Sequence, residues 1–267
     1  MELYFEIVTY ILAGLLGLCV GSFLNVVIYR TPAGMSLAAP ASHCPKCRYV
    51  LKWYDNIPVI SYLCLRGRCR SCKEKISFRY TAVELSNMLL WLLAVVMFWK
   101  RSIPFAYIAA LASSLLICVF FIDLDHKLVF DRFVLLLGGL GMGAMFTDPH
   151  YGWCSHLIGG IAGFAFFYGI ALLYTKVRGK EGLGGGDIKL TAACGLLLGW
   201  QRLLLSILLA TVAASIVLVI LSRRAGAKEE EGESAEYPFA PFLTSAFVIA
   251  LFWGSDLITA YLSLLGV

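Results

Sequence analysis

Long apolar segments alternate with short polar stretches along almost the whole chain. A helix needs about 20 apolar residues to cross a lipid bilayer, and most of the segments are near that length. The pattern predicts about eight transmembrane helices, over Glu6–Ile28, Ala82–Trp99, Pro104–Ile122, Phe133–Phe146, Leu157–Tyr174, Leu190–Gly199, Leu203–Leu221 and Pro241–Leu265.

The composition agrees with that pattern. Of the 267 residues, 60% are hydrophobic and 15% are charged, and the mean hydropathy is +0.81. Soluble domains are about half apolar and a quarter charged, so we expect an all-α polytopic membrane protein and exclude a disordered or fibrous chain. We expect the first segment to be a transmembrane helix and not a removable signal peptide, because Glu2 and Glu6 stand where such a peptide has a basic start.

The positions of the basic residues predict the orientation. Of the 22 lysines and arginines, ten lie from Arg30 to Arg79 and nine lie at alternate ends of the later segments. Cytoplasmic loops of membrane proteins carry such an excess of positive charge. We therefore expect the long loops in the cytoplasm and both chain termini outside it. The basic first loop would attract anionic membrane lipids, and we expect no nucleic acid partner.

The first predicted cytoplasmic loop contains two Cys-x-x-Cys pairs, formed by Cys44, Cys47, Cys69 and Cys72. Four thiolates on two tight turns are a typical ligand set for structural zinc. The loop is too short and polar to hold a large core, so zinc would supply its folding energy, and the reducing cytoplasm disfavours disulfides. A redox dithiol and unliganded thiols are the alternatives. We interpret His43 and Cys64 as bystanders outside the pattern.

Two aspartates lie where charged residues are costly. Asp123 follows an apolar run that ends in Phe-Phe-Ile, and the charge pattern puts it at the cytoplasmic membrane face with Asp187. Asp125 lies about 200° from Asp123 around a helix, so only one of them can face a partner, and Asp123 is the deeper. We interpret Asp125 as a solvated helix end and Asp131 as a cap of the next helix.

Two facing carboxylates indicate the chemistry of aspartic proteolysis. Close together they share one proton, because both cannot easily ionise. The ionised group takes a proton from water as that water attacks the scissile carbonyl, and the protonated group polarises the carbonyl oxygen. The glycines before the second aspartate, Gly184, Gly185 and Gly186, permit the close approach of a substrate strand.

At this point the chain resembles the bacterial type IV prepilin peptidases, membrane aspartic proteases of the GxGD type. Asp123 matches the first catalytic aspartate of that family, and Gly184-Gly185-Gly186-Asp187 matches its glycine–aspartate motif. Further stretches that fit the family are Gly21–Arg30, Asp55–Tyr62, Leu65–Cys69, and Arg79-Tyr80 with Glu84. The sequence departs from the family at Val129-Phe130-Asp131, where a proline usually precedes the aspartate, and at Thr81, where proline is common.

The resemblance implies three parts and two activities. The parts are a first transmembrane helix over 1–30, a cytoplasmic four-cysteine zinc loop over 31–79, and a transmembrane aspartic peptidase core over 80–267. The implied enzyme lies in the bacterial inner membrane and cleaves the precursors of type IV pilins and type II secretion pseudopilins after a glycine. Many members then methylate the new N-terminal amine with S-adenosylmethionine. Gly67-Arg68 aligns with a Gly-Lys pair tied to that step.

Three further expectations concern recognition and alternatives. The leaders of such substrates are basic, so we expect acidic groups to recognise them, with Glu84, Asp125 and Asp131 as candidates. A non-enzymatic pilus or secretion assembly factor is one alternative function. An ion- or proton-coupled transporter is the other, but its path would need polar groups across the whole bilayer, whereas the acidic residues gather at one face.

Overall fold

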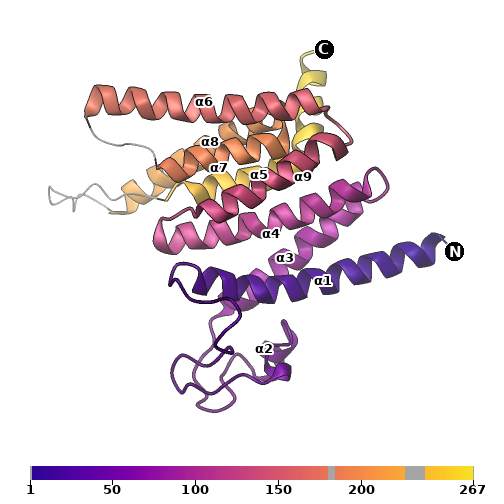
Figure 1. The fold of residues 1–267 in the computed structure, drawn as a ribbon, viewed down its shortest axis with the longest axis vertical. Coiled ribbons are helices and arrows are strands. Elements are labelled where there is room, and N and C mark those ends of the chain that lie inside the picture. The colour runs from indigo at the N-terminus through magenta and orange to yellow at the C-terminus, as the bar shows by residue number, and fades with distance from the viewer. Residues whose placement is uncertain (1, 180–183, 226–237, 267) are drawn as a thin grey trace. The chain divides into compact units, whose positions relative to one another are not determined.

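A computed structural model describes residues 2–179, 184–225 and 238–266, and these residues form helices without any β-strand. Two isolated β-bridges occur in the four-cysteine loop. The elements are α1 (Glu2–Arg30), the 3-10 helix η1 (Trp53–Asp55), α2 (Ile60–Cys64), α3 (Phe78–Phe98), α4 (Ile103–His126), α5 (Asp131–Thr147), α6 (Trp153–Arg178), α7 (Gly185–Leu198), α8 (Trp200–Ala225) and α9 (Ala240–Leu264) (Figure 1).

Each of the eight predicted apolar segments coincides with one of the longer helices, so the all-α polytopic membrane fold is confirmed. Six of them, α1, α3, α4, α6, α8 and α9, are long and apolar enough to cross a membrane. The other two are shorter, with 17 residues in α5 and 14 in α7. At 1.5 Å per residue α7 extends only about 21 Å, against about 30 Å for the apolar layer of a bilayer.

The chain divides into two compact units, Met1–Cys118 and Val119–Val267. In the first unit, α1 lies directly against α3, because two glycines one turn apart remove the side chains between the helices. A Cβ atom at Gly17 would lie 2.9 Å from the Cα atom of Met88, and one at Gly21 would lie 2.8 Å from that of Glu84. The close approach lets the Asn87 side chain donate a 2.7 Å hydrogen bond to the carbonyl of Gly17. Small residues at membrane helix interfaces act in this way.

In the second unit, α7 packs against both α5 and α6, and α8 packs against α9 (Figure 1). Glycines again set the contact distance. A Cβ atom at Gly159 of α6 would lie 2.5 Å from the carbonyl oxygen of Gly195 of α7, and one at Gly141 of α5 would lie 2.9 Å from backbone atoms of Leu196. The short helix α7 is therefore held by backbone contacts on two sides.

A buried ionic cluster holds the end of α7 that is opposite Asp187. The Arg202 guanidinium pairs with Asp148, and both side chains are almost fully buried. Arg202 Nε also donates to the carbonyl of Leu198 at 2.7 Å, and His156 Nδ1 lies 3.0 Å from the carbonyl of Leu196. These groups satisfy carbonyls at the C-terminal end of α7, where a positive charge is favourable. The charge pattern of the sequence predicts only that Arg202, with Lys100 and Arg101, lies outside the cytoplasm.

Candidate active site

Asp123 lies near the C-terminal end of α4, directly after the fully buried Ile122. Its residue exposure is only 6%, whereas Asp125 is exposed, as the helical period predicted. The Asp123 Oδ2 atom is buried and has no hydrogen-bond partner among the described residues. A buried carboxylate oxygen without a partner is costly and requires an explanation, and a role with substrate or water would provide one.

The carboxylate of Asp123 meets the N-terminal end of a second helix. The backbone N–H of Ala240, the first residue of α9, is within hydrogen-bonding reach of that carboxylate. Helix N-termini present unpaired N–H groups and a partial positive charge, which favour an anion. The sequence alone gives no sign of this contact, because nothing in the local sequence around Ala240 indicates which group its N–H faces.

Asp187 is the third residue of α7 and is half-buried. Its carboxylate is close enough to Asp123 for the charge of one to act on the other. The fold thus brings together the two aspartates that the sequence analysis selected, and each carboxylate lies at the N-terminal end of a helix. The two carboxylates are therefore within electrostatic reach of each other, and the helix end near each of them favours negative charge.

The three glycines before Asp187 have different surroundings. A Cβ atom at Gly186 would lie 2.8 Å from the Cβ atom of Val129, in the connection between α4 and α5. A Cβ atom at Gly185 would meet nothing within 4 Å, and one at Gly184 would lie 3.7 Å from the Asp187 carboxylate. Only Gly186 is therefore required for close packing, and it fastens the start of α7 to the segment that follows Asp123.

Two of the acidic residues proposed to recognise a basic leader, Asp131 and Glu84, have partners within the protein. Asp131 is the first residue of α5 and lies 2.8 Å from the Lys189 ammonium, while the N-cap is Phe130. The expectation that Asp131 caps this helix was therefore wrong. Glu84 is buried in the first unit, where its carboxylate accepts a 2.8 Å hydrogen bond from the backbone N–H of Val59. Glu84 thus anchors the loop to α3 instead of presenting a charge at the surface.

The four cysteines of the loop converge on one point. The sulfur of Cys44 lies 3.8 Å from that of Cys72, and the sulfur of Cys47 lies 3.9 Å from that of Cys69. All four sulfurs lie within 4.8 Å of one another. A tetrahedral zinc ion with bonds of about 2.3 Å places its sulfurs about 3.8 Å apart. The four cysteines therefore fit a zinc ion, and His43 and Cys64 lie outside the cluster.

The two Cys-x-x-Cys turns have matching backbones. The N–H of Arg48 donates to the carbonyl of Cys44, and the N–H of Lys73 donates to that of Cys69. Arg48 and Lys73 each follow their cysteine pair directly and have a positive φ. In the first turn, backbone N–H groups of Cys47 and Lys46 lower the pKa of the Cys44 thiol, which favours the thiolate that a metal needs.

Gly67 and Arg68 lie where the second turn begins. Gly67 has a φ of +65°, and a Cβ atom there would lie 2.9 Å from the hydroxyl oxygen of Tyr62. Arg68 forms the β-bridge with Lys75. The buried Asp55 carboxylate fastens the same turn by accepting from Arg70 Nε at 2.7 Å. These contacts shape the loop.

Two apolar cavities of the described residues, one in each unit, do not suit S-adenosylmethionine. One apolar cavity in each unit has lining side chains that are almost all hydrocarbon, and neither contains Gly67 or Arg68. A sulfonium cation with an amino acid end requires charged and hydrogen-bonding partners. Neither of these two cavities meets that requirement.

Comparison with known proteins places the chain in a family. Residues 15–98 match the model of the bacterial Peptidase A24 N-terminal domain, and residues 110–219 match that of the type IV leader peptidase family. A Pseudomonas putida protein named prepilin leader peptidase/N-methyltransferase is 36% identical over 96% of this chain and 94% of its own length. Proteins of the same name are 36% identical in Pseudomonas aeruginosa, over 94% and 93%, and 39% identical in Myxococcus xanthus, over 86% and 69%.

No solved structure matches the chain. The relatives nevertheless cover almost all of the sequence. The two family models and the six apolar helices among the described residues agree with a multi-pass membrane protein. The chain therefore belongs to the type IV leader peptidase family and is an aspartic peptidase of the membrane.

Proposed function

We propose that this protein cleaves the leader from type IV prepilins and pseudopilins with Asp123 and Asp187 as its catalytic pair. The observation that carries the proposal is the buried, unpartnered Oδ2 of Asp123 beside the carboxylate of Asp187. The names of the relatives support prepilins as the substrate class. The charge pattern supports a bacterial inner-membrane enzyme with its aspartates at the cytoplasmic face and both termini outside.

In the proposed reaction the two carboxyl groups hold one proton between them. The ionised carboxylate accepts a proton from a water molecule as the water oxygen bonds to the scissile carbonyl carbon. The protonated carboxyl group gives its proton to the carbonyl oxygen, and a tetrahedral diol forms. The C–N bond then breaks as the leaving nitrogen takes a proton from the carboxyl group that received one from water. At the same time a diol hydroxyl returns its proton to the other carboxylate, so a carboxylic acid forms and the pair again holds one proton. The Ala240 N–H and the first turn of α7 favour the negative charge that remains on the pair.

We infer a second activity, N-methylation of the new N-terminal residue, from the names of the relatives. S-adenosylmethionine would supply the methyl group. The zinc loop, with Gly67 and Arg68, is the region that the resemblance links to this step. Its chemistry needs no carboxylate pair, so methylation of a pilin that is already cleaved should continue in Asp123→Asn and Asp187→Asn variants.

The test is cleavage of a purified prepilin in liposomes, with the product mass resolved to one methyl group. Asp123→Asn and Asp187→Asn should each lower kcat by about 10⁴-fold, the usual effect of removing one member of a catalytic unit. Asp256→Asn is the matched control, because Asp256 is an exposed aspartate on α9. A folded Asn variant of either catalytic aspartate with a near-normal rate would overturn the assignment of the pair.

A further inference from the structure

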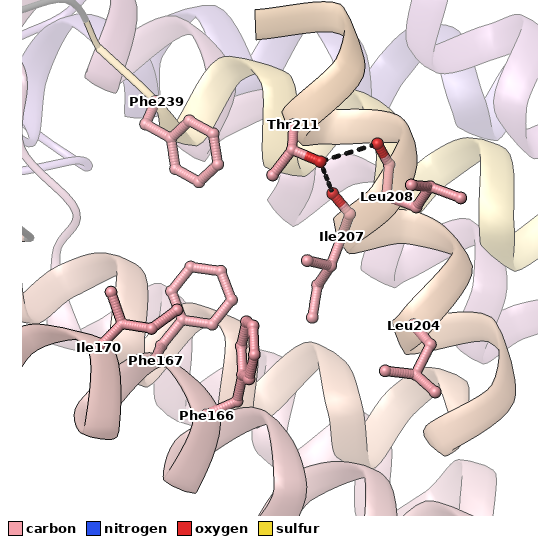
Figure 2. A pocket seen from close by; sticks show the side chains of 8 residues that line it. All are labelled: Phe166, Phe167, Ile170, Leu204, Ile207, Leu208, Thr211 and Phe239. Atoms are coloured by element: carbon pink, nitrogen blue, oxygen red, sulfur yellow. Dashed lines mark hydrogen bonds between the residues drawn. The ribbon is translucent and has the colours of Figure 1, made fainter. Parts of the chain in front are cut away.

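An apolar groove in the second unit is not used by the catalytic step. It lies between α6 and α8, has a volume of about 440 Å³, and ends at Phe239 (Figure 2). Its lining comprises Phe166, Phe167 and Ile170 of α6, Leu204, Ile207, Leu208 and Thr211 of α8, and Phe239. Thr211 carries the sole side-chain polar atom of this lining, and its hydroxyl lies 2.9 Å from the carbonyl oxygens of Ile207 and Leu208. The groove therefore presents hydrocarbon to an occupant.

The α8 wall has the spacing of a helix-binding surface. Leu204, Ile207, Leu208 and Thr211 stand at positions i, i+3, i+4 and i+7, so they form one stripe about 10 Å long. The rim is open, with Leu204 and Leu208 58% and 59% exposed, while Phe167 is buried at the floor with 4% exposure. A helix binds such a groove by inserting apolar side chains from about two of its turns.

One end of the groove lies next in sequence to a residue that contacts Asp123. Phe239 lines the groove and stands directly before Ala240, whose N–H faces the Asp123 carboxylate. From Thr211 the stripe on α8 continues along the helix to Leu204 (Figure 2). The groove therefore begins one residue from the helix end that meets Asp123.

We propose that this groove binds the apolar helix that follows the scissile bond of the peptide substrate. The proposal rests on the proposed function, because it takes the substrate to be a precursor whose apolar helix begins at the cleavage point. The occupant carries no charge along this stretch, since no lining group is available to pair with one. Lipid chains are as apolar as the substrate helix, so hydrophobicity alone does not favour the helix over lipid in this groove. The preference comes from shape and from packing against Phe166 and Phe167, which lie opposite the α8 stripe.

The first experiment compares two tryptophan variants on α6. Ile170→Trp fills the groove, whereas Ile161→Trp adds the same bulk about 180° around the helix, at a residue that is 63% exposed. Each is assayed on full-length prepilin and on a short peptide that contains the leader and cleavage site but ends before the apolar helix. Ile170→Trp should lower kcat/KM roughly tenfold or more for prepilin only, the usual effect of a disturbed apolar pocket. Ile161→Trp should match the wild type.

Unchanged kcat/KM for prepilin in Ile170→Trp would overturn the proposal, and so would an equal loss on both substrates, which would indicate damage to the aspartate site.

The second measurement is independent of cleavage. A photo-crosslinking residue replaces Leu208 in the full chain that also carries Asp187→Asn, and the protein is illuminated with prepilin in liposomes. Crosslinks to the apolar helix support the proposal, and crosslinks to lipid alone overturn it. If the groove crosslinks to prepilin but the enzyme with both aspartates intact does not cleave it, the groove proposal stands and the proposed function is rejected.

Discussion

The contact between Gly186 and Val129 gives a sharp test of how the site is held together. Replacing Gly186 with alanine places a methyl carbon 2.8 Å from the Cβ atom of Val129, whereas ordinary contact begins at 3.4 Å. That Cβ atom is fixed to its backbone and cannot rotate away. The start of α7 must therefore move by about 0.6 Å from the segment that follows Asp123.

The expected result is a slower enzyme. Because Asp187 is the next residue, the shift moves its carboxylate away from that of Asp123, its partner in the proposed catalytic pair. A misplacement of about 1 Å costs about 100-fold in rate, so Gly186→Ala should lower kcat roughly 10- to 100-fold. Gly185→Ala is the matched control, since its new methyl group would meet nothing within 4 Å, and it should keep the wild-type rate. Prepilin cleavage is measured in liposomes, with thermal unfolding to verify that both variants are folded.

A second substitution separates this contact from other effects of the new methyl group. Val129→Gly removes the Cβ atom that collides, so the double variant Gly186→Ala with Val129→Gly should recover much of the lost rate relative to Gly186→Ala. The reasoning is refuted if folded Gly186→Ala cleaves prepilin at the wild-type rate, or if Gly185→Ala loses as much activity as Gly186→Ala.

Three other predictions concern the pair, the metal and the buried cluster. A double variant of Asp123→Asn and Asp187→Asn should cleave prepilin no more slowly than either single variant, because the two act as one unit; a further large loss in kcat would indicate separate roles. Cys44→Ser should release zinc, measured by elemental analysis of the purified protein, while Cys64→Ser, outside the cluster, should retain it; absence of zinc from the intact protein would remove the metal assignment. Arg202→Met should destabilise the fold by roughly 3–5 kcal/mol, because it leaves a buried carboxylate without its partner, and an unchanged unfolding temperature would contradict that interpretation.

The sequence alone determined the features that depend on local constraints. A bilayer requires each spanning helix to be apolar over its length, so hydropathy located all eight longer helices. Two turns of fixed spacing were enough to predict the four-cysteine cluster, because each turn places its own sulfurs. The helical period separated the buried Asp123 from the exposed Asp125.

Tertiary structure alone decided the contacts between segments that are distant in the sequence. The sequence does not distinguish the three glycines before Asp187. Among them only Gly186 packs closely against Val129, because the approach of another segment sets the distance between these two residues. Hydropathy likewise assigns Arg202 to the membrane boundary, but its burial against Asp148 depends on how α5 and α8 approach each other. The N–H of Ala240 reaches Asp123 from more than a hundred residues away, and no periodic pattern encodes which helix end faces which carboxylate. Local sequence fixes which residues can form the site, whereas helix packing fixes the distances on which its chemistry depends.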